Sequence, residues 1–219
     1  MNSFWEQMLL GTWETVYMTI VSTFFGYVLG LPLGLALNIC HRNGLHPQRT
    51  IYRVVDIITN VARSIPFLIL MVIVIPISTF IVGRSYGSTA TIVPLVLGAA
   101  PFIARLVESS LNEVDKGVIE ATISMGASTW QIIWKVLLVE SRTSLLIGVT
   151  ITLCTILGYS AMAGAIGGGG LGAIAIQYGY YRYDSTMMWS AVALIIFVVQ
   201  ILQIAGMFLA RKLDHRKIH

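Results

Sequence analysis

Long apolar runs dominate the chain. Five of them approach the roughly 20 helical residues that are needed to cross the hydrocarbon core of a bilayer. They are Val16–Ile39, Val54–Val82, Ala90–Val107, Leu145–Ala163 and Met187–Leu209. Because lipid leaves no water to satisfy backbone N–H and C=O groups, each run is predicted to be helical. The pattern predicts an all-α, polytopic membrane protein with about five transmembrane helices, in which residues 1–219 form a single domain.

The second run is the longest and contains Pro66 and Pro76. Proline inside a helix removes a hydrogen bond and bends the axis, so part of this run is predicted to be bent or non-spanning. Arg63 precedes Pro66 at the start of the apolar part. A charge at mid-bilayer is costly, so Arg63 is expected either to extend to the membrane surface or to face other protein.

Composition agrees with a membrane protein. Of the 219 residues, 56% are hydrophobic and only 11% are charged, whereas soluble domains have roughly 25% charged residues. The basic residues lie beside apolar runs rather than in one stripe, which argues against a nucleic-acid partner. Cys40 and Cys154 have no CxxC spacing and no neighbouring histidine cluster. Packing is therefore the favoured role for both cysteines.

Basic residues concentrate in alternate connecting segments. The poorly charged side has Arg84, Arg182 and no Lys or Arg in Met1–Thr15. The other side contains Arg42, Arg49, Arg53, Arg105, Lys116, Lys135, Arg142, Arg211, Lys212, Arg216 and Lys217. Basic loops stay in the cytoplasm, so we expect the amino terminus outside and the carboxyl terminus inside. The amino terminus has no basic region or cleavage site typical of a signal peptide, so the first run is predicted to be retained.

Two glycine patterns stand out. Gly26, Gly30 and Gly34 lie on one face of the first run, where small residues let helices approach closely. Such packing could occur within one subunit or between subunits. Gly164–Gly172 formally matches the dinucleotide-binding pattern GxGxxG, but a membrane span precedes it rather than a strand. A re-entrant or gating loop is the better interpretation. The tyrosines of Tyr178–Tyr183 that follow indicate an interfacial aromatic belt or an external docking surface.

The chain lacks the residues of a self-powered pump. No Lys is followed by Ser or Thr, so there is no Walker A loop. No paired carboxylates lie inside the runs, and Asp56 and Arg105 fall at run ends. The four histidines, His41, His46, His215 and His219, have no metal-ligand spacing. No cofactor or metal site is therefore predicted, and the energy for any uphill transport must come from a partner.

One polar, non-spanning segment remains, Glu120–Val139, which the charge pattern places in the cytoplasm. Its apolar residues are predicted to share a side of a helix: Ile123, Trp130, Ile133, Trp134 and Leu137. Its polar residues fall mostly elsewhere: Glu120, Ser124, Gln131 and Lys135. Gly126 is predicted to divide the segment into two short helices, with Ser128 as N-cap of the second. The segment either docks a partner or lies on the membrane without one.

The segment resembles the EAA loop of ABC importer permeases, whose pattern is EAA-x3-G-x9-I-x-L-P. Here Glu120, Ala121, Gly126 and Leu138 match, Thr122 and Val136 are substitutions, and Val139 takes the place of the final proline. Further stretches extend the resemblance over most of the chain and are most similar to methionine-type permeases. These stretches are GTWETVYMT, RSIPF, IVPLVLGAAPFIARLVE, GYSAMAGAIGGGGLG and YGYYRY.

The resemblance implies a type I importer permease that forms a homodimer in the inner membrane. Two cytoplasmic ATPase subunits would bind ATP and Mg²⁺, and a periplasmic or lipid-anchored binding protein would deliver methionine or a close derivative. The cytoplasmic loop, about residues 109–143, would couple the ATPase to the spans through the two short helices. The implied contact residues are Glu120, Ala121, Thr122, Gly126, Ala127, Trp130 and Lys135.

The translocation path would then lie between two subunits. Tyr159, Ser160 and Met162 are its candidate lining or gate residues, because they precede the glycine-rich loop at the outer end of the fourth run. For Met162, plain helix packing is an equal alternative. The competing functional classes are a permease for another amino acid or small solute, an ion-coupled secondary transporter and a non-transporting membrane scaffold.

Overall fold

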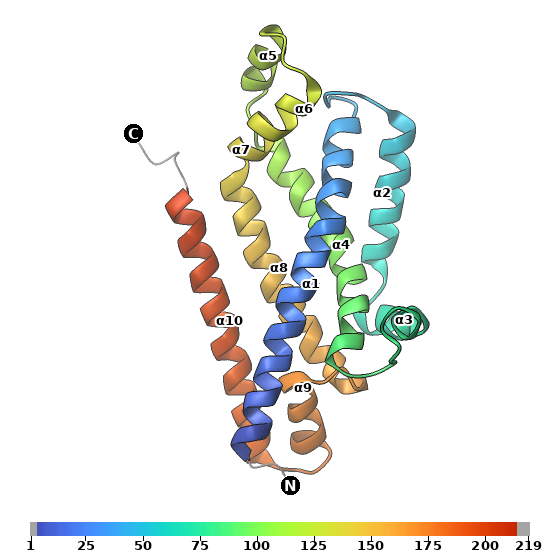
Figure 1. The fold of residues 1–219 in the computed structure, drawn as a ribbon, viewed down its shortest axis with the longest axis vertical. Coiled ribbons are helices and arrows are strands. Elements are labelled where there is room, and N and C mark those ends of the chain that lie inside the picture. The colour runs from blue at the N-terminus through green and yellow to red at the C-terminus, as the bar shows by residue number, and fades with distance from the viewer. Residues whose placement is uncertain (1–3, 214–219) are drawn as a thin grey trace.

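The computed structural model describes residues 4–213, which form a bundle of helices without β-strands in that range (Figure 1). The α-helices are α1 Phe4–Cys40, α2 Arg49–Ser64, α3 Phe67–Val82, α4 Ser88–Asn112, α5 Lys116–Ser124, α6 Thr129–Ile132, α7 Leu138–Glu140, α8 Arg142–Ala163, α9 Gly170–Ile174 and α10 Ser185–Leu213. Wider π-helical turns cover Ile133–Leu137 and Ala175–Tyr180, and a 3₁₀ turn covers Gly164–Ile166. The tail residues His215, Arg216, Lys217 and His219 lie outside the described residues.

The prediction of about five spans is confirmed. Within residues 4–213, four helical stretches are long and apolar enough to cross a bilayer: α1, α4, α10 and the stretch Arg142–Tyr180 that contains α8. The pair α2–α3 adds a fifth span when it is counted together. The first described residues of α1 and the last of α10 lie at opposite ends of the bundle (Figure 1), as an odd number of crossings requires.

The predicted bend in the second run occurs at Pro66. Helix α2 ends at Ser64, α3 starts at Phe67, and the two axes differ by 108°. Ile65 is extended with φ −82° and ψ 122°, because a following proline disfavours the α conformation. Pro76, in contrast, lies inside α3 without interrupting it. The second run therefore forms two helices at a sharp angle, the more polar α2 and the apolar α3.

The small face of α1 packs against α4 of the same subunit. A Cβ atom added to Gly30 would lie 2.7 Å from the Ile103 Cβ and 2.8 Å from the Ala100 carbonyl oxygen. A Cβ on Gly34 would lie 2.6 Å from the Ala104 carbonyl oxygen. Because these distances are well inside van der Waals contact, only glycine allows the two backbones to approach so closely. Of the two alternatives for this face, the structure supports packing within one subunit.

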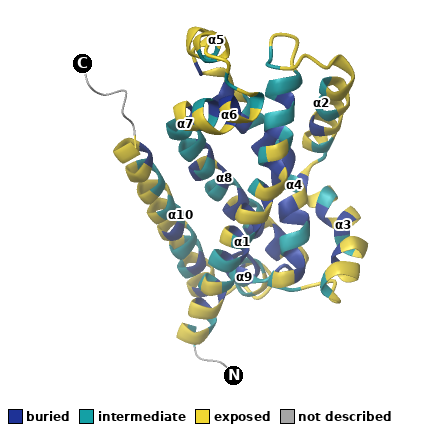
Figure 2. Cartoon of the chain, turned by 45° about the horizontal axis from the view of Figure 1, so that its top comes forward, coloured by how far each residue is buried: buried dark blue, intermediate teal, exposed yellow. Residues whose placement is uncertain are grey.

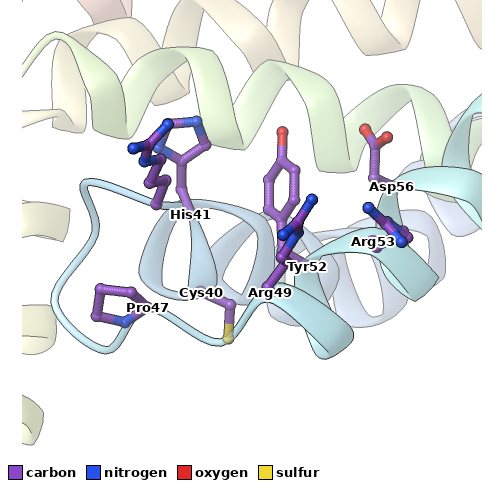
Figure 3. Close-up of a pocket in the computed structure, with 8 residues that line it drawn as sticks. Cys40, His41, Pro47, Arg49, Tyr52, Arg53 and Asp56 are labelled. Carbon is purple, nitrogen blue, oxygen red and sulfur yellow. The ribbon is translucent and has the colours of Figure 1, made fainter.

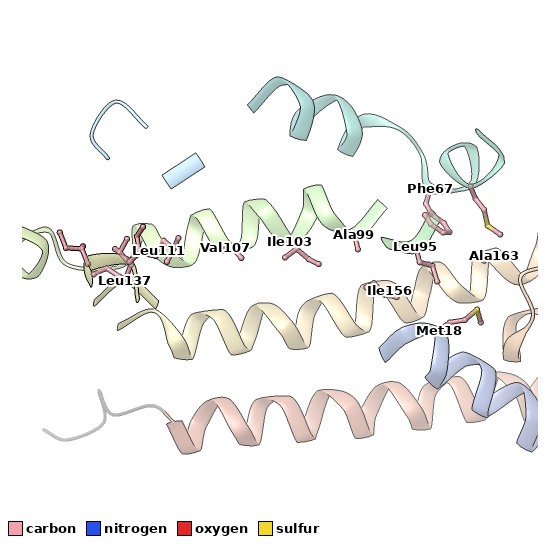
Figure 4. Close-up of a cluster of buried hydrophobic side chains, with 14 residues drawn as sticks. Met18, Phe67, Leu95, Ala99, Ile103, Val107, Leu111, Leu137, Ile156 and Ala163 are labelled. Atoms are coloured by element: carbon pink, nitrogen blue, oxygen red, sulfur yellow. The ribbon is translucent and has the colours of Figure 1, made fainter. Parts of the chain in front are cut away.

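A continuous buried core follows α4 along its length (Figure 4). Leu95 and Phe67 lie at one end of this cluster, and Leu111 contributes at the other end, beside Leu137 of the polar segment. Helix α10 contributes little to it: only 6% of its most apolar stretch is buried (Figure 2). The core therefore joins the polar segment directly to the spanning helices.

Charged residues also connect α2 to α4. The Arg105 guanidinium donates to the Asp56 carboxylate, to Glu108 Oε2 at 2.7 Å and to Asn60 Oδ1 at 2.8 Å. The arginine side chain is only 19% exposed. Such bonds satisfy a charge that would be costly in a bilayer if it were left alone. The sequence placed Asp56 and Arg105 at run ends but did not pair them.

Candidate functional site

The site is built on the segment α5–α7, Lys116–Glu140, at one end of the bundle (Figure 1). Asp115 caps α5, since its carboxylate accepts a hydrogen bond from the Gly117 N–H at 2.7 Å. No residue of α5 is buried. Helix α5 is therefore attached at its ends, and its surface is accessible to a molecule outside the bundle.

Gly126 terminates α5 in the predicted position. Its φ is +81°, in the left-handed region. Its N–H donates to the Ile123 carbonyl at 2.9 Å, and the Ala127 N–H donates to the Thr122 carbonyl at 3.3 Å. These two bonds are the Schellman arrangement, which satisfies the last carbonyls of a helix and favours glycine at this place. The division into two short helices is confirmed.

Ser128 caps the second helix as predicted. Its hydroxyl accepts from the Gln131 N–H at 3.4 Å, while the Gln131 side chain accepts from the Ser128 N–H at 2.9 Å. This reciprocal pair is a capping box. Next to it, Thr129 Oγ1 shares a hydrogen bond with His46 Nε2 from the α1–α2 connection. The start of α6 is therefore fixed both locally and by a distant loop.

The predicted apolar side of the segment divides into two. Ile133 and Leu137 are buried in the core, whereas Ile123, Trp130 and Trp134 are exposed. The prediction of one common side was wrong because it placed all five residues at a fixed angle of 100° per residue. The turn at Gly126 redirects the chain, and the π-helical turn after Ile132 changes the spacing of residues that face one way. The buried half anchors the segment and the other half remains accessible.

The accessible surface of the segment is apolar with charged residues around it. Trp130 is 67% exposed and packs edge-to-face on Trp134 at a ring distance of 5.4 Å. Met125 is 79% exposed, and Glu120 and Lys135 are exposed as well. Large exposed apolar side chains with a polar rim are typical of a protein interface. Of the other residues that the resemblance implies, Ala121 is exposed, and Thr122 and Ala127 are half-buried.

Val139 does not end the second helix. The chain continues from the π-helical turn through α7 to Glu140, and only Ser141 breaks the regular geometry before α8 begins. The Ser141 hydroxyl donates to the Leu137 carbonyl at 2.6 Å. With no proline at position 139, the segment passes into α8 through a kink rather than a stop.

The glycine-rich loop lies at the opposite end of the bundle and is attached to α1 and α4. Glu14 Oε2 accepts from the Gly170 N–H at 2.7 Å, and Thr15 Oγ1 accepts from the Leu171 N–H at 2.9 Å. The Gly87 N–H donates to the Gly167 carbonyl at 2.9 Å. The element before this loop is helix α8, which agrees with rejecting a dinucleotide site. Gly164, Gly168 and Gly170 of this loop are buried in protein, as expected for irregular backbone near a membrane, whereas Ala165 and Ile166 are exposed.

This attachment leads to a prediction. Replacing Glu14 by alanine removes the acceptor of the Gly170 N–H. Hydrogen bonds to charged groups contribute roughly 1.5–3 kcal/mol, so exchange of this amide is expected to accelerate at least about ten-fold. Hydrogen–deuterium exchange of the purified chain measures this. Glu14→Gln keeps an acceptor oxygen and is the matched control. Unchanged protection in Glu14→Ala would show that Glu14 does not hold the loop.

The tyrosines after the loop are mostly exposed. Tyr180 is 70%, Tyr181 67% and Tyr183 89% exposed, and Arg182 lies over the Tyr178 ring at 4.6 Å. Both expectations for this stretch, a membrane-surface belt and a docking surface, agree with that exposure.

The three candidate gate residues occupy different environments at the end of α8. The Tyr159 ring stacks on Phe67 of α3 with a centroid distance of 4.5 Å. Ser160 is 1% exposed and donates to the Leu157 carbonyl, so it is directed into the subunit. Met162 is 44% exposed on the surface. Of the three side chains, Met162 is the most exposed, Tyr159 is half-buried and Ser160 is buried.

Comparison with known proteins identifies the family. Residues 26–219 match the family model described as "Binding-protein-dependent transport system inner membrane component". The chain belongs to this family. As a member, it has the multi-pass architecture expected of a transport component of the inner membrane.

Curated and solved relatives share most of the chain's length. It is 50% identical over 211 residues to the "Probable D-methionine transport system permease protein MetI" of Vibrio cholerae, covering 96% of this chain and 94% of that one. It is 51% identical over 157 residues to the "D-methionine transport system permease protein MetI" of Escherichia coli K12, 72% of each chain. A chain of the MetNI methionine ABC transporter, solved in inward-facing conformations, superposes with a TM-score of 0.95 at 47% identity, covering 98% of this chain and 100% of that chain.

Sequence reasoning missed the long-range contacts of this family member. Neither the Glu14 contact to the glycine-rich loop nor the His46 contact to α6 follows from local spacing, because 156 and 83 residues separate the partners. Glu14 lies just before the first apolar run, Val16–Ile39, and a carboxylate directly beside such a run was the available signal. For His46 the sequence contains no comparable signal.

Proposed function

We propose that the chain is the transmembrane subunit of an ATP-driven importer for methionine or a close derivative. The observation that carries this proposal is the near-complete superposition on the MetNI methionine transporter chain at 47% identity. The curated relatives with "D-methionine transport" in their names support the same substrate. The similarity covers 98% of the chain, so it includes the helices that would surround the substrate as well as the 109–143 loop.

The partners follow from this role. Two copies of the chain enclose the path, and each docks one cytoplasmic ATPase through the exposed surface of α5 and α6. This surface contains Trp130 and Met125, with Glu120 and Lys135 nearby. Aromatic residues and methionine are enriched at protein interfaces, which supports docking over a free helix at the membrane surface. The ATPase supplies ATP and Mg²⁺ chemistry, so this subunit is not an enzyme by itself.

The sidedness is part of the proposal. The α5–α7 segment lies at the same end of the bundle as the α1–α2 connection, which contains Arg42 and leads into Arg49 and Arg53 of α2 (Figure 1). Such basic segments are typical of the cytoplasmic side. The glycine-rich loop then lies at the outer side, where a periplasmic or lipid-anchored binding protein delivers the substrate. Met162, on the surface near that loop, is the candidate gate residue, whereas Tyr159 stacks on Phe67 and Ser160 lies inside the subunit.

Reconstitution tests the function. We expect proteoliposomes that contain the chain, its ATPase and its binding protein to accumulate radiolabelled methionine only when ATP is present on the side of the membrane where the ATPase lies. Unlabelled methionine should compete, and other amino acids at equal concentration should not. The control is the chain alone under a proton or sodium gradient. Uptake by that control would instead indicate a secondary transporter, and no uptake in either arrangement would indicate a scaffold.

A further inference from the structure

A basic cavity lies between the end of α1 and the first two turns of α2 (Figure 3). Its volume is about 620 Å³, enough for a phosphate-bearing headgroup. The polar residues lining it are His41, Arg42, Arg49, Tyr52, Arg53 and Asp56. None of them belongs to the exposed surface of α5 and α6 or to the candidate gate residues.

The cavity has an excess of positive charge. Arg42, Arg49 and Arg53 are exposed, and none of the ion pairs among residues 4–213 involves them. The single carboxylate in the lining, Asp56, already binds Arg105 of α4. Three guanidinium groups are therefore available to an anion. Guanidinium donors match phosphate geometry particularly well, because two N–H groups can bind two oxygens of one phosphate.

An apolar surface begins immediately beside these arginines. Ile57 follows Arg53 by one helical turn and is 53% exposed, so both side chains lie on nearly the same side of α2. Val54 and Ile58 extend this surface and are 51% and 58% exposed. A free anion uses only the guanidinium groups, whereas a molecule with a phosphate and long hydrocarbon chains covers both parts. The arrangement of charge followed by exposed aliphatic residues favours the second kind of ligand.

We propose that this cavity binds the phosphate headgroup of an anionic phospholipid, such as phosphatidylglycerol, with the acyl chains along the apolar face of α2. The assignment to the inner leaflet rests on the orientation given under the proposed function. Basic pockets between helices on the cytoplasmic side are suited to such headgroups. The connection between α1 and α2 also bonds α6 through His46 and Thr129. A lipid here is therefore next to the proposed ATPase-docking segment.

The test is lipid binding to the purified full-length chain. In neutral detergent, native mass spectrometry compares phosphatidylglycerol with phosphatidylcholine of identical acyl chains. The wild-type chain should prefer phosphatidylglycerol. Each basic residue near a membrane surface contributes about 1 kcal/mol, so the double substitution Arg49→Gln and Arg53→Gln should weaken phosphatidylglycerol binding about thirty-fold. Binding of phosphatidylcholine should not change. The single substitution Arg42→Gln, in the loop rather than the helix, gives an independent measurement.

A matched control separates the cavity from general surface charge. The double substitution Arg211→Gln and Lys212→Gln removes the same charge at the same end of the bundle, from exposed positions on α10. It should weaken phosphatidylglycerol binding less than about three-fold. Equal losses in the two double variants, or equal affinity for both lipids in the wild-type chain, would overturn the proposal.

Competition by inorganic phosphate shows whether the cavity binds a lipid headgroup or a free phosphate ion. If it binds at the affinity of phosphatidylglycerol and displaces it, the site takes a free anion and the lipid assignment is wrong. None of these measurements needs the ATPase or uptake. The lipid proposal can therefore fail while the transport proposal holds, and the transport proposal can fail while the lipid proposal holds.

Discussion

Gly126→Lys is expected to abolish stimulation of the partner ATPase while the chain still inserts and folds. Gly126 has a φ of +81°, a conformation that costs other residues about 1–2 kcal/mol. A Cβ atom there meets nothing within 4 Å. The new side chain would therefore extend from the exposed turn between α5 and α6 into the volume assigned to the partner. The effect is thus expected at the interface rather than in the core.

The measurement is ATP hydrolysis by the reconstituted complex with and without substrate-loaded binding protein. We expect the stimulated rate to fall at least about ten-fold, which corresponds to ~1.4 kcal/mol of lost docking free energy. Gly83→Lys is the matched control. Gly83 has a φ of +76° at the end of α3, and its Cβ would also meet nothing within 4 Å. It lies away from the α5–α7 segment, so its variant should stimulate normally. Normal stimulation in Gly126→Lys would refute the coupling role.

The largest loss of stability is expected when the contact between α1 and α4 is blocked. In the double variant Gly30→Leu and Gly34→Leu, each new Cβ falls within 2.8 Å of a backbone carbonyl oxygen of α4. A backbone atom cannot rotate away as a side chain can, so the helices must separate. Overpacking costs about 1–3 kcal/mol at each position. The variant should be lost as aggregate on detergent extraction, or melt far below the wild type.

Gly158→Leu is the control for that variant. Gly158 lies in α8, and a Cβ atom there meets nothing within 4 Å. This variant should be extracted and melt like the wild type, as measured by size-exclusion chromatography with a thermal ramp. Separate measurement of monomer and dimer makes the test specific. If the double variant remains a stable monomer and loses only its dimer, the glycine face belongs to the subunit interface instead.

The features that follow from local rules were predictable from the sequence. Span number follows from run length, the break before Phe67 from Pro66, the end of α5 from Gly126 and the start of α6 from Ser128. Each depends on a few consecutive residues. The choice of partner for the face of Gly30 was not predictable, because small residues promote close packing with any helix. Only the structure shows that α4 is the partner, because it places Ile103 against Gly30.

The same reasoning explains what was missed at the site. The split between buried Leu137 and exposed Trp134 depends on a π-helical turn, which a fixed angle of 100° per residue does not describe. The contacts of Arg105 with Asp56, and of Glu14 with Gly170, join residues far apart in the chain. Pattern analysis placed Asp56 and Arg105 at the ends of apolar runs but did not pair them, and it did not single out Glu14.

The core along α4 has a mechanical consequence. Helix α4 contains 25 residues and is therefore about 37 Å long. Leu111 near one end packs with Leu137 of the segment proposed to dock the ATPase, and Leu95 near the other packs with Phe67, which stacks on Tyr159. A close-packed rod of this length works as a lever: for each degree of tilt at the docking end, the far end moves by about 0.6 Å. A tilt of only a few degrees therefore moves the far end by more than the radius of a water molecule.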